Sequence, residues 1–199
     1  VDPSISCPSN ITQIASANQC NKTVAYSVTA SDACGATTSL ASGLGSNGVF
    51  PVGTTTESWT ATDAAGNTAS CSFTVTIADN QNPSIICPAN ISVNNTVGVC
   101  GAAVSYAAVT SSDNCPGQTV STFSGGASGS IFGVGVNAVT LRVTDDAGNT
   151  ANCSFNITVT DNQNPVVSCP SNITQTNDPG DCFAAVTWIP ATATDNCTA

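Results

Sequence analysis

The chain has 199 residues and little charge: 2 Lys and Arg residues, 12 Asp and Glu residues, no His, and a net charge of -10 at pH 7. Nucleic acids and anionic membranes are poor partners for such a surface. Acyl transfer lacks a His beside a Ser or Cys nucleophile, so we expect that the chain is not an enzyme.

Cysteines recur along the chain at a step of 80 to 82 residues. The first position of this repeat is Cys7, Cys87 and Cys169; the second is Cys20, Cys100 and Cys182; the third is Cys34, Cys115 and Cys197; and the fourth is Cys71 and Cys153. Such a period predicts a tandem array, with module 1 at residues 1–80, module 2 at 81–162 and the first part of a truncated module 3 at 163–199. We expect that this truncation is an imposed boundary, with completion by another chain as the alternative.

Each module is too small for a stable core of its own. About 80 residues bury only about 60 to 65% of their unfolded surface, whereas two disulfides would stabilise the fold by roughly 3 to 4 kcal/mol each. Cysteines at this density indicate an oxidising, extracellular location. Zinc binding is the alternative, but the chain has no CxxC pair and no His.

No targeting or membrane segment is recognisable in the sequence. No stretch approaches the roughly 20 apolar residues that span a bilayer, and no signal peptide is present. We therefore expect no membrane insertion by this segment, infer export from the cysteines, and expect a mature or excised piece of a longer protein.

Strand patterning is clearest late in each module. Apolar and polar residues alternate at positions 59–61 and 73–77, and again at 139–144 and 155–160. Each pair of runs is separated by a turn sequence, in which Asp can bond its own backbone and Gly takes a positive φ. Short strands without a helical period predict an all-β chain of tandem, disulfide-stapled, immunoglobulin-like antiparallel β-sandwich modules.

The same alternation guides a prediction of how the cysteines pair. Cys20 shares the side of its expected strand with Val24, and Cys71 shares that of Phe73, so both should point into the core. The preferred pairs are Cys20 with Cys71, Cys100 with Cys153, Cys7 with Cys34, Cys87 with Cys115, and Cys169 with Cys197. The other two pairings that four cysteines allow remain open, as does the partner of Cys182.

Modules 1 and 2 each end in the same pentapeptide, Asp79 to Pro83 and Asp161 to Pro165. Proline fixes its own φ and favours an extended conformation of the preceding Asn. We therefore expect a short, stiff linker and modules that do not tumble freely.

Several spaced motifs resemble those of one known family. They are Cys-Pro-Ser-Asn-Ile at 7–11, Cys-Pro-Ala-Asn-Ile at 87–91, Ser-Asp-Asn-Cys at 112–115, Phe-Pro-Val-Gly at 50–53, the turn sequence at 61–67 and Cys-Ser-Phe at 71–73. Over nearly the whole chain the modules are similar to hyalin repeats, the HYR family. The resemblance implies extracellular immunoglobulin-like modules with an adhesive or scaffolding role and no enzymatic activity.

Two positions of module 1 depart from the pattern of the other modules. Glu57 stands where module 2 has the inward-facing Val139, and it could loosen one strand end. Ala33 stands where Asn precedes the third cysteine of the later modules, so an acidic-site ligand is in doubt in module 1.

Aspartates concentrate at one end of each module. The linker that enters a module, the loop after its second strand and its last hairpin turn should gather at one pole of the sandwich, where hard oxygen ligands suit Ca²⁺ bound at about 0.1 to 1 mM. The alternative is that each Asp caps a turn without metal. The candidate ligands are Asp79, Asn80, Asn82, Asp113, Asn114, Asp145, Asp146 and Asn149 in module 2; Asp161, Asn162, Asn164, Asp195 and Asn196 in module 3; and a thinner set, Asp2, Asp32, Asp63 and Asn67, in module 1.

Glycans and aromatic platforms are further candidate features. The glycosylation triplets lie at Asn10, Asn21, Asn90, Asn94, Asn152, Asn156, Asn172 and Asn196, and chance in an Asn-rich chain is their alternative explanation. Tyr26 and Trp59 have the parity of core residues, and Trp188 shares a face with Cys182. We expect core packing for these rings in preference to carbohydrate binding.

Together these patterns predict a secreted or surface-displayed structural or adhesive array such as a stalk, matrix strand or filament. Its partners would be copies of itself or other extracellular proteins, and Ca²⁺ is the one candidate cofactor. The alternative is a ligand- or glycan-binding module, or a spacer, within a larger cell-surface protein.

Overall fold

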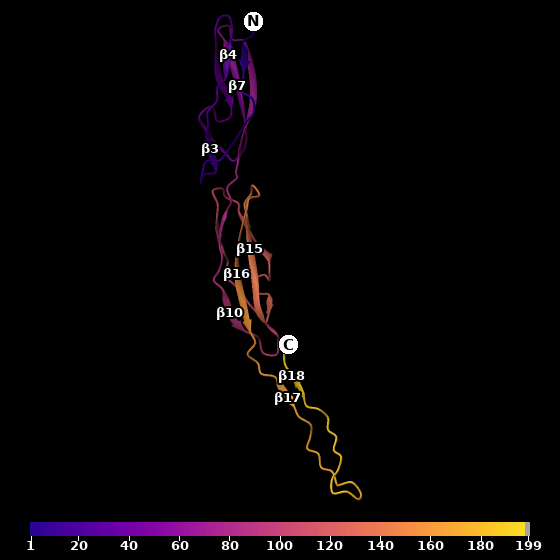
Figure 1. Cartoon of the computed structure of the whole chain (residues 1–199). Helices are drawn as coiled ribbons and strands as arrows, with labels where there is room; N and C mark the ends of the chain where they lie inside the picture. Colours follow the sequence, from indigo (N-terminus) through magenta and orange to yellow (C-terminus); the bar gives the residue numbers. More distant parts are fainter. Residues whose placement is uncertain (198–199) are drawn as a thin grey trace. The chain divides into compact units, whose positions relative to one another are not determined.

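The computed structural model describes residues 1–197, and all regular structure in this range is β-strand (Figure 1). The predicted all-β class is thereby confirmed. By its contacts the chain divides into two compact units, residues 1–86 with 109–121 and 141–153, and residues 87–108 with 122–140 and 154–199. No helix in the described range is long and apolar enough to cross a membrane.

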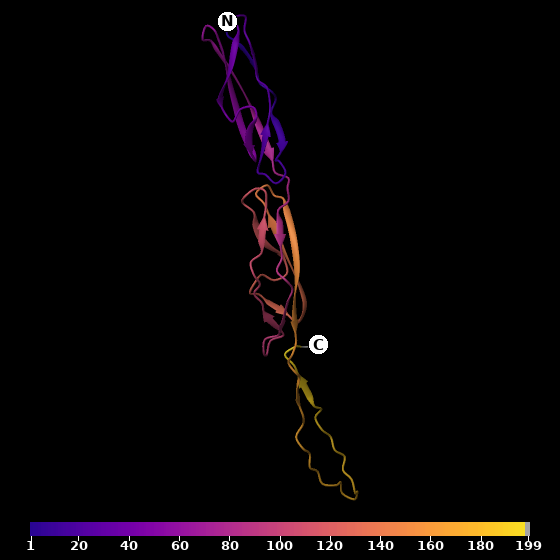
Figure 2. The same ribbon diagram turned by 90° about the vertical axis from the view of Figure 1, so that its left-hand side faces the viewer.

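The first two modules contain the same succession of strands. Module 1 contains β1 (Ser4–Ser6), β2 (Ile11–Ile14), β3 (Asn21–Val24), β4 (Thr29–Ser31), β5 (Ala36–Ser42), β6 (Gly48–Pro51), β7 (Gly53–Asp63) and β8 (Thr68–Ala78). Module 2 contains β9 (Ser84–Ile86), β10 (Ile91–Asn94), β11 (Gly101–Ala103), β12 (Thr110–Ser112), β13 (Thr119–Ser124), β14 (Ile131–Gly133), β15 (Gly135–Thr144) and β16 (Thr150–Thr160). In module 3, the described residues form only β17 (Val166–Ser168) and β18 (Thr192–Thr194), joined by irregular backbone (Figures 1 and 2).

Each of the first two modules has one four-stranded sheet. The strand orders are β2-β8-β7-β5 and β10-β16-β15-β13. The other strands form the pairs β1–β4, β3–β6, β9–β12, β11–β14 and β17–β18. Those pairs are antiparallel, as predicted, but β2 runs parallel to β8, and β10 runs parallel to β16.

This topology puts the second and third cysteines of a module at opposite ends. Strand β2 ends at Ile14 opposite Ala78, so the loop that follows β2 lies beside the linker that leaves the module. Strand β4 ends at Ser31 opposite Ser4, so the turn that follows β4 lies where the module begins. Module 2 repeats both registers in β10–β16 and β9–β12.

The core of module 1 joins residues of the β3–β6 pair and of the four-stranded sheet. Buried side chains of β3 and β6, Val24 and Phe50, cluster with Phe73, Val75 and Ile77 of β8. Along β8 buried residues alternate with more exposed ones, as the pleat requires. Tyr26 and Trp59 pack against this cluster, which confirms their predicted core position.

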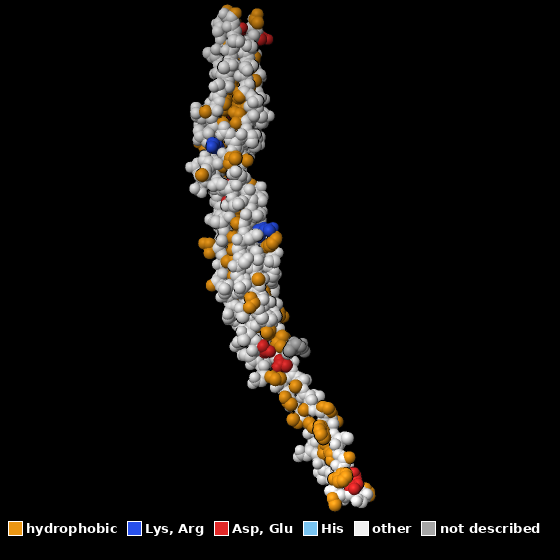
Figure 3. Space-filling view, in the orientation of Figure 1, with side chains coloured by type: hydrophobic (Ala, Val, Ile, Leu, Met, Phe, Trp, Pro, Cys, Tyr) orange, Lys and Arg blue, Asp and Glu red, His pale blue; other side chains and the backbone are white. Residues whose placement is uncertain are grey.

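The prediction that Trp188 packs in a core is wrong, because its side chain is 68% exposed. Trp188 occupies the repeat position of Tyr26 and Tyr106, whose rings make edge-on contacts with Phe73 and Phe155. Residues 163–197 contain no counterpart of these phenylalanines. Figure 3 shows apolar side chains gathered on the surface of this part of the chain.

Glu57 is fully buried in β7 and has three hydrogen-bond donors around it. The Tyr26 hydroxyl donates at 2.5 Å, and the backbone N–H groups of Leu44 and Gly45 donate at 2.7 and 2.8 Å. Burial, together with the bond to Glu57, raises the pKa of Tyr26 to about 12. The expectation that Glu57 loosens its strand is therefore wrong: the carboxylate ties the loop before β6 to β7.

Candidate functional site

Disulfides cross the two places where consecutive modules meet. Cys20 is bonded to Cys115, and Cys100 to Cys197, each with a Cα–Cα distance of 4.8 Å. Each bond joins the second cysteine of one module to the third cysteine of the next. We call the surroundings of Cys20–Cys115 joint 1 and those of Cys100–Cys197 joint 2.

A third disulfide closes module 1 on itself, between Cys7 and Cys71. Cys87 and Cys153 occupy the same repeat positions in module 2 and are also disulfide-bonded. The remaining cysteines, Cys34, Cys169 and Cys182, are free and exposed.

The five predicted pairs are therefore wrong: Cys20–Cys71, Cys100–Cys153, Cys7–Cys34, Cys87–Cys115 and Cys169–Cys197. Strand alternation does not fix the direction of Cys20 or Cys100, because each lies in the turn before its strand. The topology also separates the second and third cysteines of one module and leaves each near the adjacent module.

Linker glutamines hold the loops that carry the second cysteines. The Gln81 side chain accepts a hydrogen bond from the Asn18 N–H at 2.9 Å and donates to the Ser16 carbonyl at 3.3 Å. Gln163 holds the corresponding loop of module 2 with bonds of 3.0 and 3.3 Å. Neither glutamine is among the predicted site residues, although both lie in the identical pentapeptides, and that identity is a signal for them.

The turn that carries the third cysteine contacts the adjacent module through an asparagine. In joint 1, the Asn114 amide donates to the Gln19 carbonyl and to the Asp79 carboxylate, each at 3.2 Å. In joint 2, Asn196 donates to the Val99 carbonyl at 3.2 Å. The two asparagines predicted as metal ligands at these positions thus act as hydrogen-bond donors across the joints.

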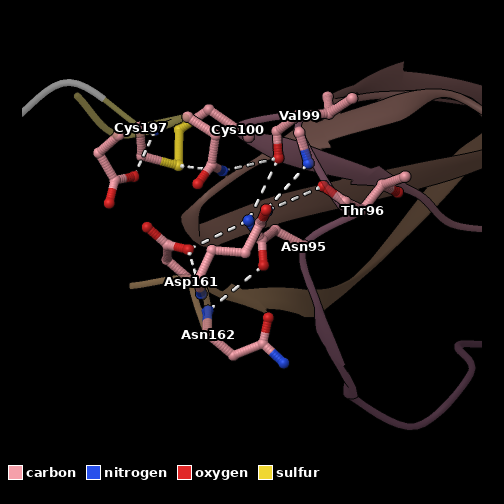
Figure 4. Close-up of a disulfide and its surroundings, with 12 residues drawn as sticks. Asn95, Thr96, Val99, Cys100, Asp161, Asn162 and Cys197 are labelled. Carbon is pink, nitrogen blue, oxygen red and sulfur yellow. Dashed lines mark hydrogen bonds between the residues drawn. A yellow bond between two sulfur atoms is a disulfide. The ribbon is translucent and has the colours of Figure 1, made fainter. Parts of the chain in front are cut away.

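Joint 2 has a further polar anchor, Asn95 (Figure 4). Its side chain is 7% exposed and donates to the Val99 carbonyl at 3.2 Å and to the Asp161 carboxylate at 3.1 Å. Its own oxygen accepts a bond from the Asn162 N–H at 3.3 Å. Ala15 takes this position in module 1, so joint 1 lacks the anchor.

One oxygen of each of two carboxylates in joint 1 has no hydrogen-bond donor. Asp79, Asp113 and Cys115 place one potential ligand atom each within 4.8 Å of one another, and Asp161, Asp195 and Cys197 do the same in joint 2. The Asp79 Oδ2 and Asp113 Oδ1 atoms are buried and have no hydrogen-bond partner. At an effective dielectric constant near 20, two negative charges at this separation repel by about 3 kcal/mol. Both sulfurs are in disulfides and so are no thiolate ligands.

Other predicted metal ligands form hydrogen bonds within their own turns. The Asp145 carboxylate accepts bonds of 2.7 and 2.8 Å from the backbone and side chain of Asn149. Asn149 also donates to the Asp79 carbonyl at 3.3 Å, so the hairpin does reach the linker. In module 1, the Asn67 side chain bonds to Asp63 in the same way and lowers the pKa of that carboxyl group.

The remaining candidate metal ligands lie outside the two groups of Asp and Cys residues. The Asp146 carboxylate lies against Gly117, where an added Cβ would come within 2.1 Å of it. Asp32 accepts a bond of 2.9 Å from the Cys34 N–H. The side chains of Asp2, Asn80, Asn82, Asn162 and Asn164 are exposed.

The predicted glycosylation sites differ in what their side chains do. Asn10, Asn90, Asn94, Asn152, Asn156 and Asn172 are exposed, whereas Asn21 and Asn196 are half-buried. The Asn196 amide nitrogen, to which a glycan would be attached, donates to the Val99 carbonyl, and the Thr of this triplet lies outside the described residues.

Comparison with known proteins identifies the repeat. The family model described as HYR domain matches residues 1–77 and again residues 78–159. Hyalin of Strongylocentrotus purpuratus is 35% identical over 161 residues, which are 78% of this chain and 13% of that protein. Hyalin of Lytechinus variegatus is 34% identical over 113 residues, which are 55% of this chain and 21% of that protein. The chain thus spans a small part of the curated relatives that it matches.

The solved structures that match are more distant in sequence. Repeats EC21-23 of human CDH23 are 15% identical, with a TM-score of 0.41, and the match covers 98% of this chain and 80% of that chain. Extracellular cadherin domains 3-6 of protocadherin gamma B2 are 14% identical, with a TM-score of 0.39, over 80% of this chain and 52% of that chain.

Proposed function

This chain belongs to the HYR domain family, and from that premise we propose that it is a structural, adhesive segment of an extracellular protein whose modules share tension through covalent bonds. The observation that carries this proposal is the disulfide between modules, which recurs at the same repeat positions in Cys20–Cys115 and Cys100–Cys197. Covalent bonds between modules would let a stalk, matrix strand or filament carry load, whereas catalysis has no use for them. Its partners would be other extracellular proteins or further copies of the chain.

The disulfides shorten the covalent route between the two ends. From Cys7 the route follows the chain to Cys20, crosses to Cys115, returns to Cys100 and crosses to Cys197. About 40 residues then lie under tension, which extend to roughly 140 Å, whereas all 199 residues of the reduced chain extend to roughly 700 Å. The oxidised segment therefore resists extension even after its sheets have unfolded.

Single-molecule pulling from both ends tests this function. We expect the oxidised chain to reach its limit near 140 Å, and the same molecules in a thiol reductant to stretch about five times further. An oxidised chain that extends to several hundred ångströms would contradict the proposal.

The surroundings of the exposed Trp188 do not support the alternative function, which is glycan binding. A hollow beside Trp188 is lined by Pro170, Asn172 and Ile189, among others. However, the counterparts of Trp188 in modules 1 and 2 pack against core phenylalanines. Trp188 therefore holds a core position of the repeat, and the hollow beside it does not support a sugar site.

We further propose that joint 1 binds Ca²⁺ between Asp79 and Asp113. The two buried oxygens without a donor are hard ligands of the kind that Ca²⁺ prefers, and a cation would relieve their repulsion. The chain offers only 2 Lys and Arg residues for that purpose, Lys22 and Arg142. Asp161 and Asp195 would form the corresponding site in joint 2.

Chelation should lower the melting temperature of the chain by several degrees, because Ca²⁺ bound only by the folded state stabilises it. The double substitution Asp79→Asn with Asp113→Asn should reduce this response to the part that joint 2 supplies, and it should leave the chelated protein at least as stable as the unsubstituted one. Asp181→Asn, which changes an exposed acid outside the candidate ligands, is the control and should keep the response. Equal melting curves of the unsubstituted chain with excess calcium and with excess chelator would refute the site.

A further inference from the structure

Two of the predicted glycosylation triplets hold the same place in modules 1 and 2. Asn10 begins the triplet Asn-Ile-Thr just before β2, and Asn90 begins the triplet Asn-Ile-Ser just before β10. Both asparagine side chains are exposed. We propose that Asn10 and Asn90 carry N-linked glycans, and that these glycans cap the open edges of the two four-stranded sheets.

The amide oxygen of each asparagine is held by the neighbouring strand. Asn10 Oδ1 accepts a hydrogen bond from the Thr74 N–H of β8 at 3.0 Å. Asn90 Oδ1 accepts one from the Asn156 N–H of β16 at 2.9 Å. A backbone N–H can only donate, so the amide atom that faces it is the oxygen. The planar amide therefore directs its nitrogen, the atom to which a glycan is attached, away from that N–H.

The hydroxyl at the third position of each triplet has no structural role that would explain it. Thr12 and Ser92 are exposed, and within residues 1–197 neither hydroxyl forms a hydrogen bond. The fold thus accounts for each asparagine, whose oxygen bonds to a strand, but not for the hydroxyl two residues later. Glycan transfer requires both groups at this spacing, so glycosylation accounts for the complete triplet.

Both triplets lie on strands whose outer side is open. Strands β2 and β10 begin the orders β2-β8-β7-β5 and β10-β16-β15-β13, so one side of each has no partner strand among the described residues. An open edge can pair with the edge of another molecule, and proteins commonly prevent this with Lys or Pro on the edge strand. Both strands are short, but β2 (Ile-Thr-Gln-Ile) and β10 (Ile-Ser-Val-Asn) contain no charged residue and no Pro. A bulky, hydrophilic glycan at the start of each strand would block such pairing.

The transfer needs an activated sugar donor, whose chemical class is an oligosaccharide on a polyprenyl diphosphate. The asparagine amide nitrogen attacks the anomeric carbon of the first sugar and loses one proton. The bond from this carbon to the diphosphate oxygen breaks, and the lipid diphosphate leaves. The product keeps its amide oxygen, so the hydrogen bonds from the Thr74 and Asn156 N–H groups remain.

Glycopeptide mapping of the protein purified from its own source tests the modification. An amidase that removes N-linked glycans converts each modified Asn to Asp, and isotopically heavy water marks this conversion. We expect the mark at Asn10 and at Asn90. The absence of the mark from both asparagines would overturn the proposal, and its absence from one would overturn the proposal for that module.

Two double variants, secreted from eukaryotic cells, test whether the glycans cap the edges. Thr12→Ala with Ser92→Ala removes both acceptor hydroxyls and keeps both asparagines with their bonds to β8 and β16. The matched control, Thr56→Ala with Ser121→Ala, removes two exposed hydroxyls outside any triplet and should keep both glycans. With the free thiols alkylated, light scattering at rising concentration should give the first variant at least about twice the average mass of the control, because its edges can pair. Equal masses of the two variants would show that the glycans do not cap the edges.

The proposal goes beyond the proposed function, which concerns bonds within one chain. Unmodified asparagines would leave the disulfides and the pulling behaviour of the single chain unchanged. Conversely, an oxidised chain that extends to several hundred ångströms would contradict that function and leave the glycan sites unaffected. The two can therefore be judged separately.

Discussion

Replacing Cys100 and Cys197 together with serine should lengthen the stretched, oxidised chain from roughly 140 Å to roughly 350 Å. Without this bond, the covalent route can no longer cross from Cys100 to Cys197, and it follows the chain from Cys115 towards the C-terminus. Roughly 100 residues then lie under tension. Single-molecule pulling between the two ends measures this length directly.

The matched control removes the other bond between modules, by replacing Cys20 and Cys115 with serine. Tension then crosses from Cys7 to Cys71 and follows the chain to Cys100, a route of nearly the same length. The extended length should therefore stay near 140 Å, although joint 1 has lost its bond. Equal lengthening of both double variants would show that the disulfides are not connected in this way.

The sequence predicts the fold of the first two modules well, because strand alternation and the repeat are local properties. The buried positions of β8 and β16 follow the same pattern along both strands. The prediction fails at the cysteines for a physical reason: alternation orients residues within strands, and Cys20, Cys34 and Cys100 lie in turns.

The pairing between modules depends on strand order, which a local pattern does not determine. The parallel pair β2–β8 and the pair β1–β4 together place the second and third cysteines at opposite ends of a module. The regular spacing of the cysteines does not distinguish the two kinds of pairing, since bonds within a module and bonds to the next module would both recur once per repeat. The pole of acidic residues was easier to predict, because its turns and linkers carry Asp and Asn in recognisable motifs.

Replacing Glu57 with valine, the residue at the same place in module 2, should lower the free energy of unfolding of module 1 by about 3 to 4 kcal/mol. The substitution leaves the Tyr26 hydroxyl and the N–H groups of Leu44 and Gly45 without their acceptor, and an unsatisfied buried donor costs about 1 to 3 kcal/mol. Val139, at the same place in module 2, is fully buried and apolar, so it needs no such donors.

Thermal and denaturant unfolding measure this loss, with two variants for comparison. Thr56→Val changes an exposed neighbour on the same strand and should shift stability by less than about 0.5 kcal/mol. Tyr26→Phe removes one donor and keeps the two backbone bonds, so it should cost only about 1 kcal/mol. A Glu57→Val chain as stable as the Thr56→Val chain would mean that the carboxylate does not hold the loop, and that module 1 depends on its apolar core and its disulfide alone.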